Sequence, residues 1–280
     1  MVRSSIEPAA MAGVAAVLIA AIGVPHGGLD HWVGRRKLKP KLGHLWMPTF
    51  FGSYLTVAVL VAILWVAFPA ATIVTFVVIS AWHFGREDTL RMTGGWGSHL
   101  IATATGGVVI WVPAIVRPAE MRSLLLPLTG GSIDSAEMTV WVTAWIAAVM
   151  LPLAWFAWWQ RTRSVHEGML FPVTVLAASV LPILVSFTLY FCGWHSIRGL
   201  KRLRRSENLE WLEFGFAVAP LSVLAVIGIT ATGMCVGGIS ALTLTDSSIL
   251  QMTFIGLASI AVPHVAVHEL LEDNASVEPG

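Results

Sequence analysis

Residues 46–68 read WMPTFFGSYLTVAVLVAILWVAF, an apolar stretch without a single charged side chain. A helix needs roughly 20 mainly apolar residues to cross a lipid bilayer, so this stretch is long enough to do so. Inside hydrocarbon every backbone polar group must be paired within the segment, which a helix achieves and an isolated strand does not. The stretch therefore predicts a membrane-spanning helix.

Similar apolar stretches recur along the whole chain. They cover residues 9–25, 70–84, 99–116, 138–159, 170–194, 211–233 and 248–268. The 280 residues are 56% hydrophobic and 12% charged, whereas soluble domains contain about 25% charged residues. We therefore expect residues 1–280 to form a single integral membrane domain, an all-α polytopic transmembrane bundle of about 7–10 helices, some short or broken. The net charge of +1 indicates no nucleic-acid partner.

The first apolar stretch, 9–25, resembles the core of a signal peptide but has no Ala-x-Ala cleavage site before the polar turn, so we expect it to be a retained span. Basic residues gather at 35–41, 86–91 and 201–205. Because Lys and Arg concentrate in cytoplasmic loops, these clusters predict a multi-pass protein of the plasma membrane with its N-terminus outside. Segment 170–194 has basic residues near both ends and contains two prolines, which break helices. It is expected to form two short helices, or one that enters the membrane and returns.

Five histidines lie at or near the ends of apolar segments: His26, His83, His195, His264 and His268. His31 follows just after the first span. Ionisable residues inside a membrane are costly and usually functional. A single such histidine could simply pack between helices, but that explanation is weaker for five. If the spans alternate, the first four reach a similar depth at the cytoplasmic side. Neutral imidazoles suit Fe, Zn, Cu or Ni, so the pattern favours a metal centre.

Acidic and aromatic side chains accompany these histidines. Asp30, Asp88 and Glu269 are candidates to accept the second imidazole N–H of a metal-bound histidine, whereas Glu87 fits better in the headgroup region. Aromatic rings beside the histidines could line an apolar tunnel for a long flat substrate, or pack in the core. These rings belong to Trp82, Phe84, Tyr190, Phe191 and Trp194. Cys192 and Cys235 are expected to be small core residues.

Four stretches around the histidines resemble the Brp/Blh family of bacterial and archaeal β-carotene 15,15′-dioxygenases. They are GVPHGGLD at 23–30, WHFGRED at 82–88, YFCGWHSIRG at 190–199 and GLASIAVPH at 256–264. The resemblance implies a non-haem Fe(II) enzyme that uses O₂ to cleave the central 15,15′ double bond of β-carotene into two retinal molecules. The retinal would pass to a rhodopsin. By position, the family's proposed iron ligands fall on His26, His83 and His195, and its C-terminal Pro-His falls on His264.

The chain departs from the family pattern at one position. The family commonly has H-S-x-R-H, but here the second histidine is replaced by Gly199. His31 and His268 are not general features of the family, so either His264 completes a set of four ligands or one of these two histidines substitutes.

Two other functions fit the same residues. A related oxygenase acting on another carotenoid shares every feature of the sequence. A non-catalytic transporter or metal-binding protein could also carry histidines and acids in membrane helices. A transporter often shows paired broken helices in two related halves, and no such internal repeat is present in the sequence.

Overall fold

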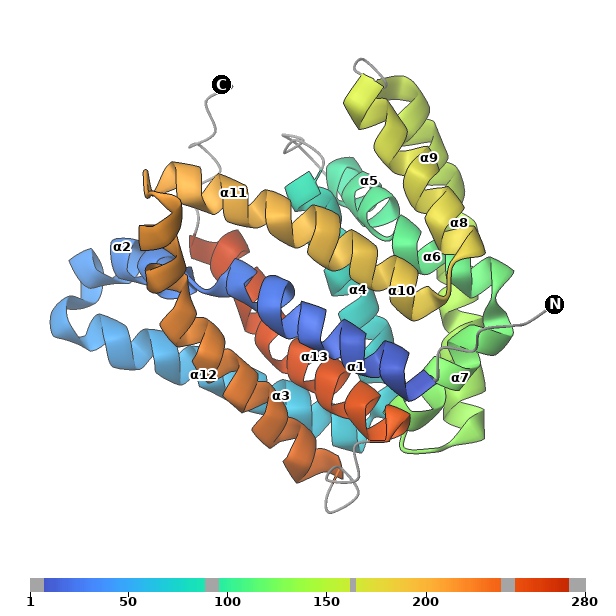
Figure 1. Ribbon diagram of the computed structural model, residues 1–280, viewed down its shortest axis with the longest axis horizontal. Helices are drawn as coiled ribbons and strands as arrows, with labels where there is room; N and C mark the ends of the chain where they lie inside the picture. Colours follow the sequence, from blue (N-terminus) through green and yellow to red (C-terminus); the bar gives the residue numbers. More distant parts are fainter. Residues whose placement is uncertain (1–7, 89–95, 162–164, 238–244, 272–280) are drawn as a thin grey trace.

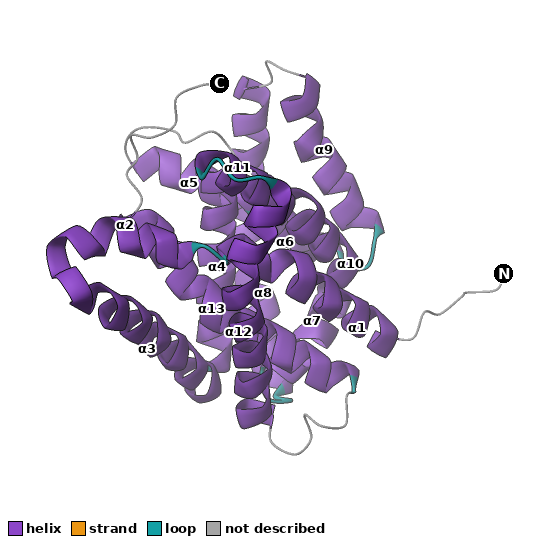
Figure 2. Ribbon diagram, turned by 60° about the vertical axis from the view of Figure 1, so that its left-hand side comes forward, coloured by secondary structure: helices purple, strands orange, loops and turns teal. Residues whose placement is uncertain are grey.

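A computed structural model describes residues 8–88, 96–161, 165–237 and 245–271, and every regular element within these ranges is helical (Figure 2). The elements are α1 (Pro8–Leu18), the π-helix η1 (Ile19–Gly23), the 3₁₀-helices η2 (Val24–Gly27) and η3 (Gly43–Leu45), α2 (Asp30–Leu42), α3 (Trp46–Ala67), α4 (Pro69–Asp88), α5 (Trp96–Gly106), α6 (Val108–Val116), α7 (Pro118–Leu128), α8 (Ile133–Arg161), α9 (Val165–Val180), α10 (Ile183–Thr188), the π-helix η4 (Leu189–Ser196), α11 (Ile197–Ser206), α12 (Trp211–Gly237) and α13 (Asp246–Leu271). The predicted all-α bundle with short and broken helices is confirmed.

Helix α13 runs through the middle of the bundle (Figure 1). It packs against α1, α2, α3, α4, α7 and α12. Among the described residues, four helical segments are long and apolar enough to cross a membrane: Ala10–Ala67, Ile133–Gln160, Trp211–Val236 and Ser247–Leu271. A fifth arises if α5 and α6, bent by 60° at Gly107, count as one broken span. The protein is therefore a multi-pass membrane protein.

The number of such segments is smaller than the number of apolar stretches in the sequence, because Ala10–Ala67 contains two of the stretches and stretches 99–116 and 170–194 are interrupted. Helix α9 ends at Val180, and α10 begins at Ile183 after Pro182, whose φ of −52° and ψ of 143° are extended. Segment 170–194 therefore consists of two helical pieces, one of the two arrangements predicted from its prolines.

Two charged side chains at the start of α7 pair the backbone groups exposed by this break: Arg117, just before the helix, and Glu120 in its first turn. Arg117 donates to the carbonyl oxygens of Ser179 and Val180 at 3.2 and 3.0 Å. Glu120 accepts a hydrogen bond from the backbone N–H of Ile183 at 2.7 Å. Helix ends carry unpaired N–H and C=O groups that need partners when they lie inside a protein. Arg117 and Glu120 therefore stabilise the break between α9 and α10.

The basic clusters lie together at one end of the bundle. Arg36 in α2 pairs with Glu207 after α11, and Arg202 in α11 pairs with Glu87 at the end of α4. Arg86 in α4 pairs with Glu269 in α13 at 3.3 Å. These ion pairs connect segments that the charge pattern assigns to a single side of the membrane.

Candidate metal centre

Irregular helices carry two of the predicted histidines. His26 lies in the 3₁₀-helix η2, directly after the π-helix η1, and His195 lies in the π-helix η4. A π-turn contains more residues than an α-turn, so it rotates the following side chains relative to a regular helix, and such turns are frequent at functional sites. Pro25, at the start of η2, lacks a backbone N–H and therefore tolerates this change of helix type.

A close crossing of α4 and α5 fixes the position of His83. A Cβ atom added to Gly85 would lie 1.8 Å from the carbonyl oxygen of Ala102, and one added to Gly106 would lie 2.1 Å from the backbone nitrogen of Gly85. Only glycine permits such backbone approach. The two glycines thus let α4 lie directly against α5 two residues from the histidine.

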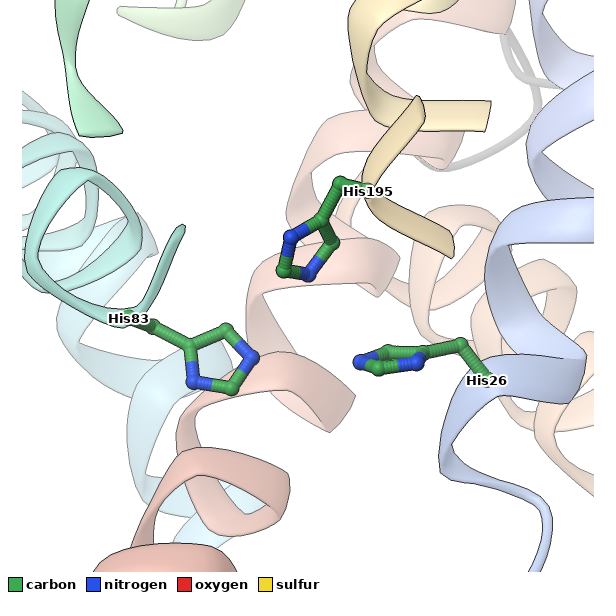
Figure 3. Close-up of side chains that lie close together, drawn as sticks. All are labelled: His26, His83 and His195. Atoms are coloured by element: carbon green, nitrogen blue, oxygen red, sulfur yellow. The ribbon is translucent and has the colours of Figure 1, made fainter. Parts of the chain in front are cut away.

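The side chains of His26, His83 and His195 converge from three separate segments (Figure 3). One ring nitrogen of each lies within 4.8 Å of the corresponding nitrogens of the other two. The ring centroids are 5.0 Å apart for His26 and His195, 5.4 Å for His83 and His195, and 6.2 Å for His26 and His83. Metal–nitrogen bonds of roughly 2.1 Å place two ligands of one ion at most about 4 Å apart, so small side-chain rotations would bring all three onto one ion.

His264, in α13, extends this group. Its ring centroid lies 5.0 Å from that of His26 and 5.3 Å from that of His83. Its Nδ1 atom lies 2.9 Å from both carboxylate oxygens of Asp30 and can donate a hydrogen bond to them. A proton on Nδ1 leaves the lone pair on Nε2 available to a metal. Asp30 therefore lies where it can accept the N–H of a histidine ring, as predicted.

Asp30 is the centre of a buried polar network. Besides His264, it accepts from His268 Nε2 at 3.4 Å and from the Tyr54 hydroxyl at 3.4 Å. The Tyr54 hydroxyl also lies 3.0 Å from the carbonyl oxygen of Ile260 in α13. Tyr54 was not among the predicted site residues. No sequence signal identifies it, because it comes from the middle of the apolar helix α3.

The remaining polar candidates lie elsewhere. Glu269 pairs with Arg86 and not with a histidine, and Glu87 pairs with Arg202 in the basic region. Asp88 ends α4, and its side chain lies outside the described part of the structure. The ring of His31 contacts Trp32. His268 lies 4.5 Å from His264 between ring centroids and uses Nε2 toward Asp30.

Gly199, where the family commonly has a second histidine, lies directly against His26. A Cβ atom added there would lie 2.2 Å from His26 Nδ1 and 2.3 Å from its Cε1. The imidazole of His26 thus occupies the space that a side chain at position 199 would need. The observed position of His26 therefore requires glycine at position 199.

Within the described residues, several nitrogens of the cluster are buried and lack a hydrogen-bond partner. They are Nδ1 and Nε2 of His26, Nδ1 and Nε2 of His83, and Nε2 of His264. A buried polar atom without a partner costs roughly 1–3 kcal/mol. Coordination to a transition metal would satisfy such nitrogens, and imidazole donors suit iron, zinc, copper or nickel. The residues present therefore fit a metal ion.

A large apolar cavity adjoins the histidines. Its volume is about 1270 Å³, above the roughly 300–1,000 Å³ typical of small-molecule sites. It touches His26, His83, His195 and His264 and is bounded mainly by aliphatic and aromatic side chains of α3, α4, α7, α10, η4, α12 and α13. The cavity can therefore hold a long apolar molecule next to the imidazole rings.

Two of the five predicted tunnel aromatics line this cavity, namely Phe84 and Phe191. Phe191 lies four residues before His195, and their rings are nearly parallel at 16° with centroids 6.1 Å apart. Phe187, one turn earlier, continues the stack at 12° and also lines the cavity. Residues four apart share a helix face, so the wall runs along η4 and α10.

The other three predicted aromatics, Trp82, Tyr190 and Trp194, are not part of the cavity lining. Trp82 donates a hydrogen bond from Nε1 to His99 Nδ1 at 3.0 Å. Trp82 and Trp194 each precede a histidine by one residue and lie on a different face of the helix from it. Phe84, on the other side of His83, reaches the cavity.

Comparison with known proteins points to a single family. The sequence profile described as "Beta-carotene 15,15'-dioxygenase" matches residues 17–272. A protein of an uncultured marine bacterium, 66A03, named "Beta-carotene 15,15'-dioxygenase", is 26% identical over 270 residues, covering 92% of each chain. The "Probable beta-carotene 15,15'-dioxygenase Blh" of Halobacterium salinarum is 26% identical over 304 residues, covering 94% of this chain and 85% of its own. No solved structure matches the chain.

Proposed function

The chain belongs to the beta-carotene 15,15′-dioxygenase family, and on that basis we propose that it is an Fe(II)-dependent membrane dioxygenase that cleaves β-carotene at its central double bond. The observation that carries the proposal is the convergence of His26, His83 and His195 beside an apolar cavity. A metal centre alone would fit many activities. A metal centre at the wall of a large apolar cavity inside a membrane protein fits the oxidation of a long hydrocarbon.

In the proposed reaction one carbon–carbon double bond breaks and two carbon–oxygen double bonds form. Both oxygen atoms of O₂ enter the products, one in each retinal, so no further reductant or proton is needed. When bound, iron supplies the activation of O₂, and the protein supplies binding and orientation. His26, His83, His195 and His264 would hold the ion, with His264 completing the set of four ligands.

The chain's own residues have three tasks in this proposal. Asp30 holds His264 in the tautomer that presents Nε2 to the cluster. The stacked rings of Phe187 and Phe191 offer a flat wall on which a conjugated chain can lie. The apolar lining excludes water and fixes the central double bond near the metal, since reacting atoms must approach within roughly 3–3.5 Å.

We also propose the location and the product's destination. The ion-paired basic end would face the cytoplasm, which places the N-terminus outside the plasma membrane. Retinal formed in the membrane would pass to a rhodopsin.

Expression in a bacterial host that accumulates β-carotene tests the proposal. We expect loss of the orange colour and the appearance of two retinal molecules per β-carotene consumed. Unchanged β-carotene in cells whose purified protein contains iron would contradict the proposal. Two aldehydes of unequal length would contradict cleavage at the central bond.

A further inference from the structure

The cavity beside the histidines has an open side between α3 and α12. Six residues define this α3–α12 groove: Leu55, Val59, Ile63 and Val66 on α3, and Leu224 and Gly228 on α12. All six line the cavity and are also exposed at the outer surface of the protein. The exposed fraction is 49% for Val59, 56% for Ile63 and 61% for Leu224. Side chains that line a cavity and are exposed at the same time mark its mouth.

The mouth lies at membrane depth. Helix α3 contains no charged residue, and α12 contains none after Glu213. Both helices belong to segments that are long and apolar enough to cross a membrane. An open cavity between two such helices faces hydrocarbon, where an apolar molecule can move into it without crossing water.

The groove is continuous with the metal centre. Helices α3 and α12 both pack against α13, and the α13 residues Gly256 and Ile260 form part of the cavity lining. At its inner end the same cavity touches Tyr54, His26 and His264. From Tyr54 to Val66 the groove follows α3 for 12 residues, or about 18 Å at 1.5 Å per residue. The groove is therefore elongated along α3 and reaches the imidazoles at its inner end.

Small residues keep the groove open on the α12 side. A Cβ atom added to Gly228 would meet nothing within 4 Å, which shows open space beside this position. Ala225 and Ala231 also line the cavity there. A stripe of small residues alone would not indicate a ligand, but here it borders a cavity that leads to buried imidazoles.

From this geometry we propose that the α3–α12 groove is a lateral portal through which a linear C40 polyene enters from the bilayer and binds lengthwise. The proposal rests on the proposed function for the identity of the polyene. It adds a path and a binding surface that neither the histidines nor their neighbouring aromatics provide. It also explains why the lining residues of α3 and α12 are aliphatic: they contact an apolar chain in a region otherwise filled by lipid tails.

Matched tryptophan substitutions test the portal. Val59→Trp places a bulky ring in the groove, whereas Leu64→Trp places the same ring on the same helix at a position that is 47% exposed and does not line the cavity. We expect Val59→Trp to lower the initial rate of retinal formation in membranes at least about fivefold at wild-type iron content. Leu64→Trp should stay within about twofold of wild type. Both estimates assume that the substitution hinders entry of the polyene into the cavity and leaves the metal centre unchanged.

Gly228→Phe provides a second obstruction from the opposite wall, where the added side chain meets no protein atom at its Cβ. A wild-type rate in both Val59→Trp and Gly228→Phe would overturn the portal. An equal loss of rate in Leu64→Trp would overturn it as well, because the effect would not depend on the groove.

A binding measurement separates failure of the portal from failure of the proposed function. Metal-depleted protein is purified from β-carotene-producing cells, and the retained carotenoid is measured by its absorbance. We expect wild type and Leu64→Trp to retain β-carotene and Val59→Trp to retain less than a third as much. If the iron-loaded wild type makes no retinal but this difference persists, the portal stands and the proposed reaction fails. Equal retention by all variants, or retention of phospholipid alone, would overturn the portal.

Discussion

Two groups of three side chains lie next to each other in the buried centre of the protein and differ in how their polar atoms are satisfied. His26 and His83 have both ring nitrogens buried without a hydrogen-bond partner among the described residues, and they cluster with His195. Asp30, His264 and His268 form a second group whose members are joined by hydrogen bonds. In the proposed metal centre the first group would supply ligands to the ion, and the second would orient His264 toward it.

Removing a member of the first group should have the largest effect. We expect His83→Ala to weaken iron binding by more than about 100-fold, because even partners outside the ligand set contribute roughly 10- to 100-fold. Iron content of the purified protein checks this. His99→Ala is the control, since His99 is exposed and bonds Trp82. Normal iron content in His83→Ala would remove the distinction between the two groups.

Removing the centre of the second group should have an intermediate effect. Asp30→Ala leaves His264 without its carboxylate partner, and we expect metal affinity to fall about 10- to 100-fold. Asp30→Asn keeps a hydrogen-bond acceptor and should lose less. Titration of the metal-depleted protein with Co(II), followed by its visible absorption, measures both. Wild-type affinity in Asp30→Ala would show that the second group does not support the first.

Displacing a proposed ligand without removing it should lower metal affinity less than either of these changes. In Gly199→Ala the new Cβ would meet the ring of His26, which must shift by more than an ångström to restore ordinary contact. We expect about a tenfold loss of metal affinity, at the lower end of the range for disturbed ligand orientation. Gly193→Ala is a matched control, because a Cβ there meets nothing within 4 Å. The same Co(II) titration applies, and equal behaviour of the two variants would contradict the crowded position of His26.

The smallest effect is expected at the edge of the second group. Tyr54→Phe removes one hydroxyl near Asp30 and leaves the His264–Asp30 bond in place. At 3.4 Å this hydrogen bond to the carboxylate is long, so we expect it to contribute about 1 kcal/mol and metal affinity to fall less than about fivefold. A loss as large as that of Asp30→Ala would show that the hydroxyl, and not the carboxylate, holds the network together.

The helical bundle and the convergence of four histidines could be predicted from the sequence. Uninterrupted apolar stretches define helices in lipid, and His26, His83, His195 and His264 each lie at or near the end of such a stretch. Asp30 could be predicted as an acceptor for a histidine N–H, but its partner, His264, is 234 residues away in the sequence and could not be identified from it.

Other features of the site depend on helix phase and on packing between distant segments. The π-helices η1 and η4 change the direction of the side chains that follow them, and no residue pattern announces them. Tyr54 reaches Asp30 because α3 packs on both α2 and α13. The cavity is bounded by aliphatic residues of α3 and α12 that carry no signal except hydrophobicity. Of the five predicted tunnel aromatics, Phe84 and Phe191 line the cavity and the other three do not, because the direction of each ring depends on helix phase.

X-ray absorption at the iron edge of the purified wild-type protein tests the central claim most directly. The account predicts one iron per chain, surrounded by imidazole nitrogens at roughly 2.1 Å, with this signal lost in His83→Ala. An iron spectrum dominated by sulfur, or retinal formation by protein that contains no iron, would contradict it.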